Sequence, residues 1–142
     1  MQIIKVKNIN ELSQEFMRSP FIINNLSDYI LYYDFTLPDG KYDWKGISFI
    51  DTIAYRKTRG NFLNPHYMGS FNDVCIVEDS DWLNELKSRQ SKDAELKYYP
   101  DFTFKHYIVY FEGYGTFEFI AQDVKLDAPK LEDIINKILK HE

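Results

Sequence analysis

The sequence predicts an α+β fold: one domain, residues 1–142, built mainly of antiparallel β-sheet with an N-terminal, a middle and a C-terminal helix. Three observations support this prediction. The chain has 142 residues, which suits a single domain. Two stretches alternate apolar and polar side chains on either side of a turn motif, as β-hairpins do. Aromatic residues make up 17% of the chain, and this ring surface offsets the entropy cost of ordering the backbone, which excludes an intrinsically disordered protein.

The N-terminal segment predicts a short strand followed by a helix. Gln2–Val6 is an apolar run of strand length. Asn8 can cap a helix, because Glu11 lies three residues later and can bond back to the cap amide. Pro20 then ends this helix. Phe21–Leu26 is compatible with either an extension of this unit or a packed connector.

Two long hairpins, joined to short strands, make up the predicted sheet. The first, Asp28–Tyr55, alternates along both arms and turns at Pro38-Asp39-Gly40. The second, Phe102–Leu126, turns near Gly113. The second hairpin has large side chains on both faces, so we expect it to lie centrally in the sheet.

A strand and a helix are predicted between the hairpins. Residues 56–72 show no regular period and form a long loop. Val74–Val77 is a short apolar strand, and Asp79, Ser80 and Asp81 are all suitable N-cap residues for a helix that runs to about Arg89.

The last helix is predicted to begin at Asp127, which serves as its N-cap. Pro129 is tolerated in the first turn of a helix. The apolar stripe of this helix must pack on another element and consists of Leu131, Ile134, Ile135, Ile138 and Leu139.

Charge and composition narrow the classes of partner. The formal net charge of −5 argues against nucleic acid as a partner and favours a basic protein. No stretch approaches the roughly 20 apolar residues of a membrane helix, so we expect no membrane partner and a cytoplasmic location. Cys75 is the only cysteine. Its apolar neighbours indicate a buried, inert thiol.

Motifs for catalysis, cofactor binding and metal binding are missing, so we predict no residue for any of these roles and no cofactor. The three histidines do not have metal-ligand spacing, and no phosphate-binding or nucleophile motif occurs in a suitable context. His106 lies within a strand, where we expect a packed, hydrogen-bonded side chain. Asp34 and Asp51 interrupt apolar strands; we expect both to face solvent and to lie near one another across the first hairpin.

Surplus aromatic and acidic residues suggest a contact surface. Alternating apolar residues already occupy one face of the first hairpin, so the further aromatic rings lie on the other face. Exposed Tyr and Trp side chains are typical of protein-contact hot spots. Acidic residues would speed the encounter with a basic partner. The predicted partner-binding residues are Glu78, Asp79, Asp81, Tyr32, Tyr42 and Trp44.

Two alternatives remain open. The first is a small-molecule-binding or hydrolase-like domain with a pocket beneath the 56–72 loop, where four side chains would converge: Arg56, His66, Tyr67 and His106. The second is a structural homo-oligomer that associates through its aromatic sheet face.

Three segments resemble, as a set, small and largely uncharacterised bacterial proteins, some of which are similar to immunity proteins of polymorphic toxin systems. They are Ile53–Arg56, Val77–Leu83, and the pair His106–Phe111 and Phe117–Asp123. The resemblance implies a non-enzymatic protein-binding module that neutralises a partner, such as a basic toxin, by occluding its surface. Because the shared features are packing and capping patterns, the resemblance assigns no catalytic residue.

Overall fold

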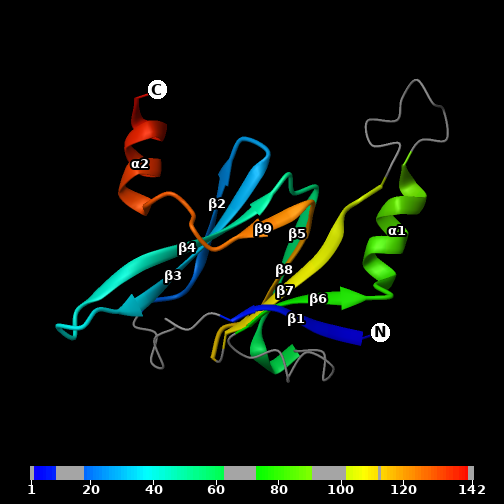
Figure 1. Cartoon of the computed structure of the whole chain (residues 1–142), viewed down its shortest axis with the longest axis horizontal. Coiled ribbons are helices and arrows are strands. Elements are labelled where there is room, and N and C mark those ends of the chain that lie inside the picture. The colour runs from blue at the N-terminus through cyan, green and yellow to red at the C-terminus, as the bar shows by residue number, and fades with distance from the viewer. Residues whose placement is uncertain (1, 9–17, 63–72, 91–101, 112, 141–142) are drawn as a thin grey trace.

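The fold consists of two antiparallel sheets packed face to face, with one helix on the outer side of each sheet (Figure 1). A computed structural model describes residues 2–8, 18–62, 73–90, 102–111 and 113–140. The described helical elements are η1 (Gly60–Phe62), α1 (Asp81–Arg89) and α2 (Leu131–Leu139).

The described strands divide between a five-stranded and a four-stranded sheet. The five-stranded sheet has the spatial order β1 (Gln2–Asn8), β6 (Asp73–Glu78), β7 (Lys105–Phe111), β8 (Gly115–Ala121) and β5 (Ala54–Thr58). The four-stranded sheet has the order β2 (Phe21–Asn25), β3 (Asp28–Thr36), β4 (Tyr42–Ile50) and β9 (Asp123–Lys125).

Two bent segments join the sheets along one side. The chain passes from β4 to β5 through Asp51, whose φ of 51° lies in the left-handed region, and from β8 to β9 through Gln122. Both segments stay paired across the bend, because Gln122 N–H donates to the Ile50 carbonyl and Ile53 N–H donates to the Ile120 carbonyl. Strands that change sheet at such corners are a recognised way of building a two-sheet core.

The core lies between the two sheets and is rich in aromatic rings. The Phe49 and Phe119 rings stack with their centroids 3.8 Å apart, and Tyr33 packs against Phe111 across the same space. These contacts join β3 and β4 to β7 and β8, and all four residues belong to one buried cluster. The aromatic content of the chain therefore serves first to fill the space between two facing sheets.

Each helix covers only part of one outer face. Ile134 of α2 packs with Ile30 and Tyr32 on the four-stranded sheet, whereas Trp82 of α1 packs edge-on against His106 of the five-stranded sheet. The two helices lie at opposite sides of the molecule (Figure 1). Among the described residues, neither the length nor the apolar content of any helix is sufficient to span a membrane.

The α+β class and the antiparallel strands are confirmed, but the predicted hairpin arrangement is wrong. Only Asp28–Ile50 of the first hairpin pairs as β3 and β4, because the chain bends at Asp51 and β5 joins the other sheet. The second hairpin pairs Lys105–Ala121 as β7 and β8, and β9 again changes sheet. Phe21–Asn25, left open by the sequence, is an edge strand.

The three predicted helices have different outcomes. The middle helix is confirmed, with Ser80 as its N-cap. The last helix begins at Leu131 rather than after Asp127, because the preceding residues first pass over β4, where Ala128 lies next to Gly46. The predicted N-terminal helix lies almost entirely in 9–17, outside the described residues, and its predicted cap Asn8 belongs to β1.

Two further predictions concern buried side chains. Cys75 is buried as expected, and burial raises the pKa of its thiol to about 11. The solvent-facing position expected for Asp34 is wrong, because its side chain is fully buried on the outer face of β3. Asp51 also lies far from it, at the opposite end of the hairpin, where its amide donates to the Asp28 carboxylate.

Candidate functional site

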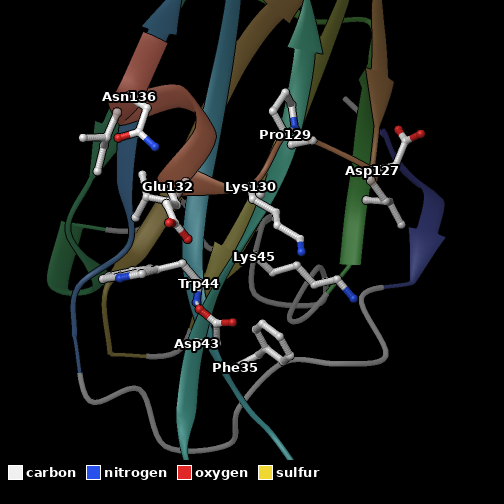
Figure 2. A pocket seen from close by; sticks show the side chains of 14 residues that line it. Phe35, Asp43, Trp44, Lys45, Asp127, Pro129, Lys130, Glu132 and Asn136 are labelled. Atoms are coloured by element: carbon white, nitrogen blue, oxygen red, sulfur yellow. Dashed lines mark hydrogen bonds between the residues drawn. The ribbon is translucent and has the colours of Figure 1, made fainter. Parts of the chain in front are cut away.

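A groove of about 610 Å³ lies between α2 and β4 (Figure 2). Its walls come from β4 and the neighbouring Phe35, from the segment 126–130 that joins β9 to α2, and from the first turns of α2. This volume is in the range of about 300–1,000 Å³ that is typical of ligand sites. It is therefore the main candidate binding site in the described part of the chain.

The groove combines apolar surface with charged side chains of both signs, since Asp43, Asp127 and Glu132 line it together with Lys45 and Lys130. Trp44 and Phe35 contribute rings, and Leu131 contributes an aliphatic side chain from α2. Lys45 from β4 and Lys130 from the β9–α2 segment extend over the same region of the groove (Figure 2). The Lys45 Nζ also lies 5.3 Å from the centroid of the Phe35 ring, close enough for a cation–π attraction.

The apolar stripe of α2 is only half used by the core. Ile134 is buried against the sheet, but Ile135, Ile138 and Leu139 are 43%, 48% and 59% exposed. The predicted stripe therefore packs on the sheet only in part. The exposed residues continue the apolar surface of the groove, since Ile135 also lines it. We call Ile135, Ile138 and Leu139 the α2 ridge.

A buried carboxylate lies behind the groove wall. Asp34 pairs with Trp44 across the β3–β4 ladder. Its Oδ2 accepts bonds from the Arg18 amide at 2.9 Å and the Arg18 Nε at 3.3 Å. The guanidinium carbon of Arg18 lies 4.1 Å from the centroid of the Trp44 ring. Asp34 thus fixes Arg18, and Arg18 helps to orient the Trp44 ring at the groove.

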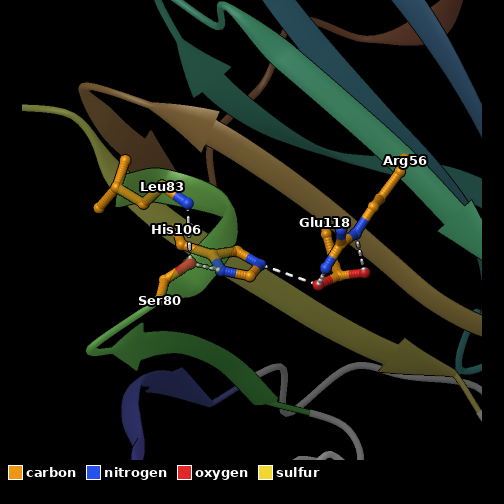
Figure 3. A network of polar contacts seen from close by, with 5 residues as sticks. All are labelled: Arg56, Ser80, Leu83, His106 and Glu118. Carbon is orange, nitrogen blue, oxygen red and sulfur yellow. Dashed lines mark hydrogen bonds and ion pairs between the residues drawn. The ribbon is translucent and has the colours of Figure 1, made fainter. Parts of the chain in front are cut away.

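A second polar cluster lies on the outer face of the five-stranded sheet (Figure 3). Ser80 Oγ is 2.6 Å from His106 Nδ1, and His106 Nε2 is 2.8 Å from Glu118 Oε1. The Arg56 Nε donates to Glu118 Oε2 at 2.8 Å, and a terminal nitrogen donates to Oε1 at 3.0 Å. The cluster thereby connects four elements, β5, β7, β8 and the N-terminus of α1.

The donors and acceptors of this cluster can all be matched. An ionised carboxylate only accepts, so the hydrogen between His106 and Glu118 belongs to Nε2. Nδ1 and the Ser80 hydroxyl share a second hydrogen, and the Ser80 oxygen also accepts from the Leu83 amide at 3.1 Å. Burial raises the pKa of Glu118, but hydrogen bonds from His106 and Arg56 and the Arg56 charge outweigh it, so its pKa is lowered overall.

The serine, histidine and glutamate of this cluster are the residue types of a nucleophilic triad, but their geometry favours a structural role. A nucleophilic hydroxyl must be accessible to its substrate, whereas Ser80 is only 4% exposed. Its oxygen also caps α1, and attack on a substrate would disrupt that cap. The arrangement therefore cross-links the sheet and fixes α1 in place.

The predicted partner-binding residues do not form one surface. Glu78, Asp79 and Asp81 are exposed where β6 leads into α1. Tyr42 and Trp44 lie on β4, in the other sheet and on the opposite side of the molecule (Figure 1). The expectation of an exposed Tyr32 is wrong, because its ring is buried beneath α2 and its hydroxyl donates to the Pro129 carbonyl.

Of the residues predicted to line the alternative pocket, the structure shows two to converge. Arg56 and His106 both bond to Glu118, so these two predicted residues do converge. His66 and Tyr67 lie outside the described residues. Within the described ranges, no group of three or more histidine, cysteine and acidic side chains is arranged to hold a metal ion.

Ser80 and Glu118 were not predicted as partners of His106. A charged residue such as Glu118 within an otherwise apolar strand indicates a buried polar contact, but the sequence does not show which residues it meets. The strand order places Glu118 opposite Arg56 on β5 and diagonal to His106 on β7. Lys130 was missed as a groove residue, because the sequence predicted it inside a helix.

Comparisons with protein-family models, with curated proteins and with solved structures found no match to this chain. The resemblance to immunity proteins stays a prediction.

Proposed function

We propose that this chain is a non-enzymatic binding module that engages a protein partner through the groove and the adjoining α2 ridge. The observation that carries the proposal is the α2 ridge itself: three large aliphatic residues remain exposed on the same apolar stripe of the helix as the buried Ile134. Exposed apolar surface of this kind next to a groove is typical of interaction sites. Trp44 in the groove is the type of residue that anchors such interfaces.

The net charge of −5 carried by the whole chain suits a partner with basic residues around an apolar centre. On α2 itself the exposed Glu132 and Asp133 of the first turn are accompanied by Lys137 in the last turn. Charges at a rim mainly raise the rate of association, whereas the apolar centre supplies most of the affinity. Neutralising a basic toxin by occlusion, as the resemblance implies, is one form that such binding would take.

A photo-crosslinking experiment tests this proposal. Benzoylphenylalanine placed at Leu139 in the full chain should capture a protein from the native host, and the same group at Leu26 should not. Leu26 is a suitable control because it is 85% exposed and lies in the β2–β3 turn, away from α2. The captured protein is then purified and titrated against Leu139→Asp and Leu26→Asp.

The expected result is that Leu139→Asp weakens binding of the purified partner at least tenfold, which corresponds to about 1.4 kcal/mol, while Leu26→Asp has no effect. Equal capture from both positions, or equal binding by both variants, would overturn the proposal. Light scattering of the chain alone tests the homo-oligomer alternative: a dimer that Leu139→Asp dissociates would replace the partner by a second copy.

The hydrolase-like alternative rests on the convergence of Arg56, His106 and Glu118 next to Ser80. A fluorophosphonate probe labels activated serines and therefore distinguishes a catalytic role of Ser80 from a structural one. We expect no labelling, because the Ser80 side chain is buried and its oxygen already bonds to the Leu83 amide and to His106 Nδ1. Labelling that Ser80→Ala abolishes would establish the alternative.

A further inference from the structure

A second pocket, of about 500 Å³, lies at the end of β5 in the five-stranded sheet. One wall comes from β5 and the residues that follow it, and the other comes from the end of β7 and the β7–β8 turn. The described lining residues are Lys57, Arg59, Gly60, Tyr110, Gly113 and Tyr114. The volume is within the range of about 300–1,000 Å³ that is typical of ligand sites. None of these six residues lines the groove beside α2.

The two walls of this pocket are held together by a close backbone approach at Gly115. This residue has a φ of 94°, and a Cβ atom on it would overlap the Thr58 carbonyl oxygen. Glycine therefore allows the β7–β8 turn to pack directly on the backbone that carries Lys57 and Arg59. Beyond β5, the Phe62 amide donates to the Arg59 carbonyl at 2.9 Å, which fixes the chain after the strand. The pocket is thus preformed.

Both charged residues in the described lining of the pocket are basic. The neighbouring Arg56 is already paired with Glu118, but in the described ranges no acidic side chain forms an ion pair with Lys57 or Arg59. Lys57 Nζ lies 5.2 Å from the centroid of the Phe117 ring, and a cation–π contact leaves the N–H groups of the ammonium able to donate to an anion. A chain of net charge −5 therefore has two unpaired positive charges at one pocket.

The chemistry of these two cations favours a phosphate group over other anions. A phosphate monoester carries a charge of about −1.5 to −2 at pH 7, which matches the two positive charges, whereas a carboxylate would neutralise only one of them. The guanidinium of Arg59 can donate two parallel bonds to phosphate oxygens, and the ammonium of Lys57 adds a compact charge. The pocket is larger than a phosphate group, and Tyr110 and Tyr114 in its wall suit an organic group with apolar surface.

We propose that this pocket binds a small organic phosphate monoester. Its phosphate group lies between Lys57 and Arg59, and its organic group lies against Tyr110 and Tyr114. The net charge of −5 disfavours an extended polyanion such as nucleic acid, whereas a single phosphate group requires only the local positive charge. This inference goes beyond the proposed function, because it concerns neither the groove nor the α2 ridge.

Titration of the isotope-labelled full chain with phenyl phosphate, followed by amide NMR at constant ionic strength, tests the inference. Gly60 and Gly113 line the pocket, whereas Gly40 and Gly46 belong to the β3–β4 hairpin of the other sheet. We expect the amide signals of Gly60 and Gly113 to shift and to saturate, and those of Gly40 and Gly46 to stay unchanged. Inorganic phosphate should bind at least about fivefold more weakly, because it buries no apolar surface against the tyrosines.

Neutral substitutions supply the matched variants. Lys57→Gln and Arg59→Gln should each weaken phenyl phosphate at least about fivefold, because each removes a charge-assisted hydrogen bond. Lys87→Gln on α1 changes the net charge by the same amount at an exposed lysine and should leave the affinity unchanged. Glu112, in the same turn as Gly113, lies outside the described residues, and Glu112→Gln should not weaken binding, since it removes a negative charge. Far-ultraviolet circular dichroism verifies that each variant is folded.

The inference is overturned if phenyl phosphate leaves the Gly60 and Gly113 signals unchanged, or if the signals of the other sheet shift as much. It is also overturned if Lys87→Gln weakens binding as much as Lys57→Gln and Arg59→Gln do, or if Glu112→Gln weakens it. Equal affinity for inorganic phosphate would overturn the assignment of an organic ligand. These results are independent of the proposed function, which is judged by crosslinking and binding at Leu139.

Discussion

The outer faces of the two sheets contain the same arrangement of three residues, but the buried carboxylate is fully hydrogen-bonded in only one of them. In each, a buried carboxylate holds an arginine whose guanidinium carbon lies 4.1 Å from the centroid of a tryptophan ring. On the five-stranded sheet these are Glu118, Arg56 and Trp82. On the four-stranded sheet they are Asp34, Arg18 and Trp44.

The two carboxylates differ in how many of their oxygens are bonded. Both oxygens of Glu118 accept hydrogen bonds, from Arg56 and His106. Only Oδ2 of Asp34 is bonded, and its buried Oδ1 has no hydrogen-bond partner among the described residues. A satisfied buried network rigidifies its surroundings, whereas a partly satisfied one costs free energy. The complete cluster lies under a capped helix, and the incomplete one lies beside the open groove.

The largest expected difference concerns the carboxylates themselves. Glu118→Gln should lower the free energy of unfolding by about 2–3 kcal/mol, because it removes a charge that accepts bonds from two residues. Asp34→Asn should lower it by less than about 1 kcal/mol, since one oxygen is unbonded and a neutral amide is easier to bury. Urea unfolding followed by circular dichroism measures both, and equal losses would show that the clusters are equivalent.

Acid should weaken the complete cluster through Glu118. Its pKa is below the ordinary value of 4.5, so the unfolded chain takes up a proton at a higher pH than the folded chain does. The stability that Glu118 contributes is therefore fully present above pH 4.5 and is lost as the pH falls through its folded pKa. Urea midpoints measured between pH 3 and pH 7, as bounds set by the carboxyl range, should fall less steeply for Glu118→Gln than for the unaltered chain.

The helix caps should give smaller individual effects, in opposite directions. Ser80→Ala should cost about 1–2 kcal/mol, because it removes the cap of α1 and the hydroxyl bonded to His106. At the corresponding position of α2, Lys130 makes no side-chain cap bond, so Lys130→Ser should stabilise the chain by about 0.5–1 kcal/mol. Thermal unfolding of both variants tests this, and destabilisation by Lys130→Ser would contradict it.

The smallest difference is expected at the arginines. Arg56→Lys should cost about 1 kcal/mol, because lysine cannot replace the two bonds to Glu118 while stacking on Trp82. Arg18→Lys should cost about 0.5 kcal/mol or less, since its side chain bonds to one oxygen only and solvent screens both arginines. Their side chains are 44% and 45% exposed, which makes the comparison a matched one. A larger loss for Arg18→Lys would reverse the ranking of the clusters.

Local chemistry in the sequence was sufficient for several parts of the structure. The sequence predicted the turn at Pro38-Asp39-Gly40, the strands on either side of it and the buried thiol of Cys75, and it narrowed the N-cap of α1 to Asp79, Ser80 and Asp81. Each depends on residues close together in the chain: a residue with positive φ at Gly40, alternation along a strand, or a side chain three positions before an amide.

Only the tertiary structure decided which strands are neighbours and what covers each outer face. The alternation of apolar and polar residues shows which side chains share a face of a strand. It continues unchanged across Asp51, so it does not reveal that the chain bends there and that β5 joins the other sheet. The meeting of His106 with Glu118 and the burial of Asp34 depend on strand order and on a distant arginine. The end of the β4–β9 pairing depends on where the chain turns away after Lys125. Contacts between residues far apart in the chain leave no periodic signal, and for that reason the sequence predicted the strands but not the groove between them.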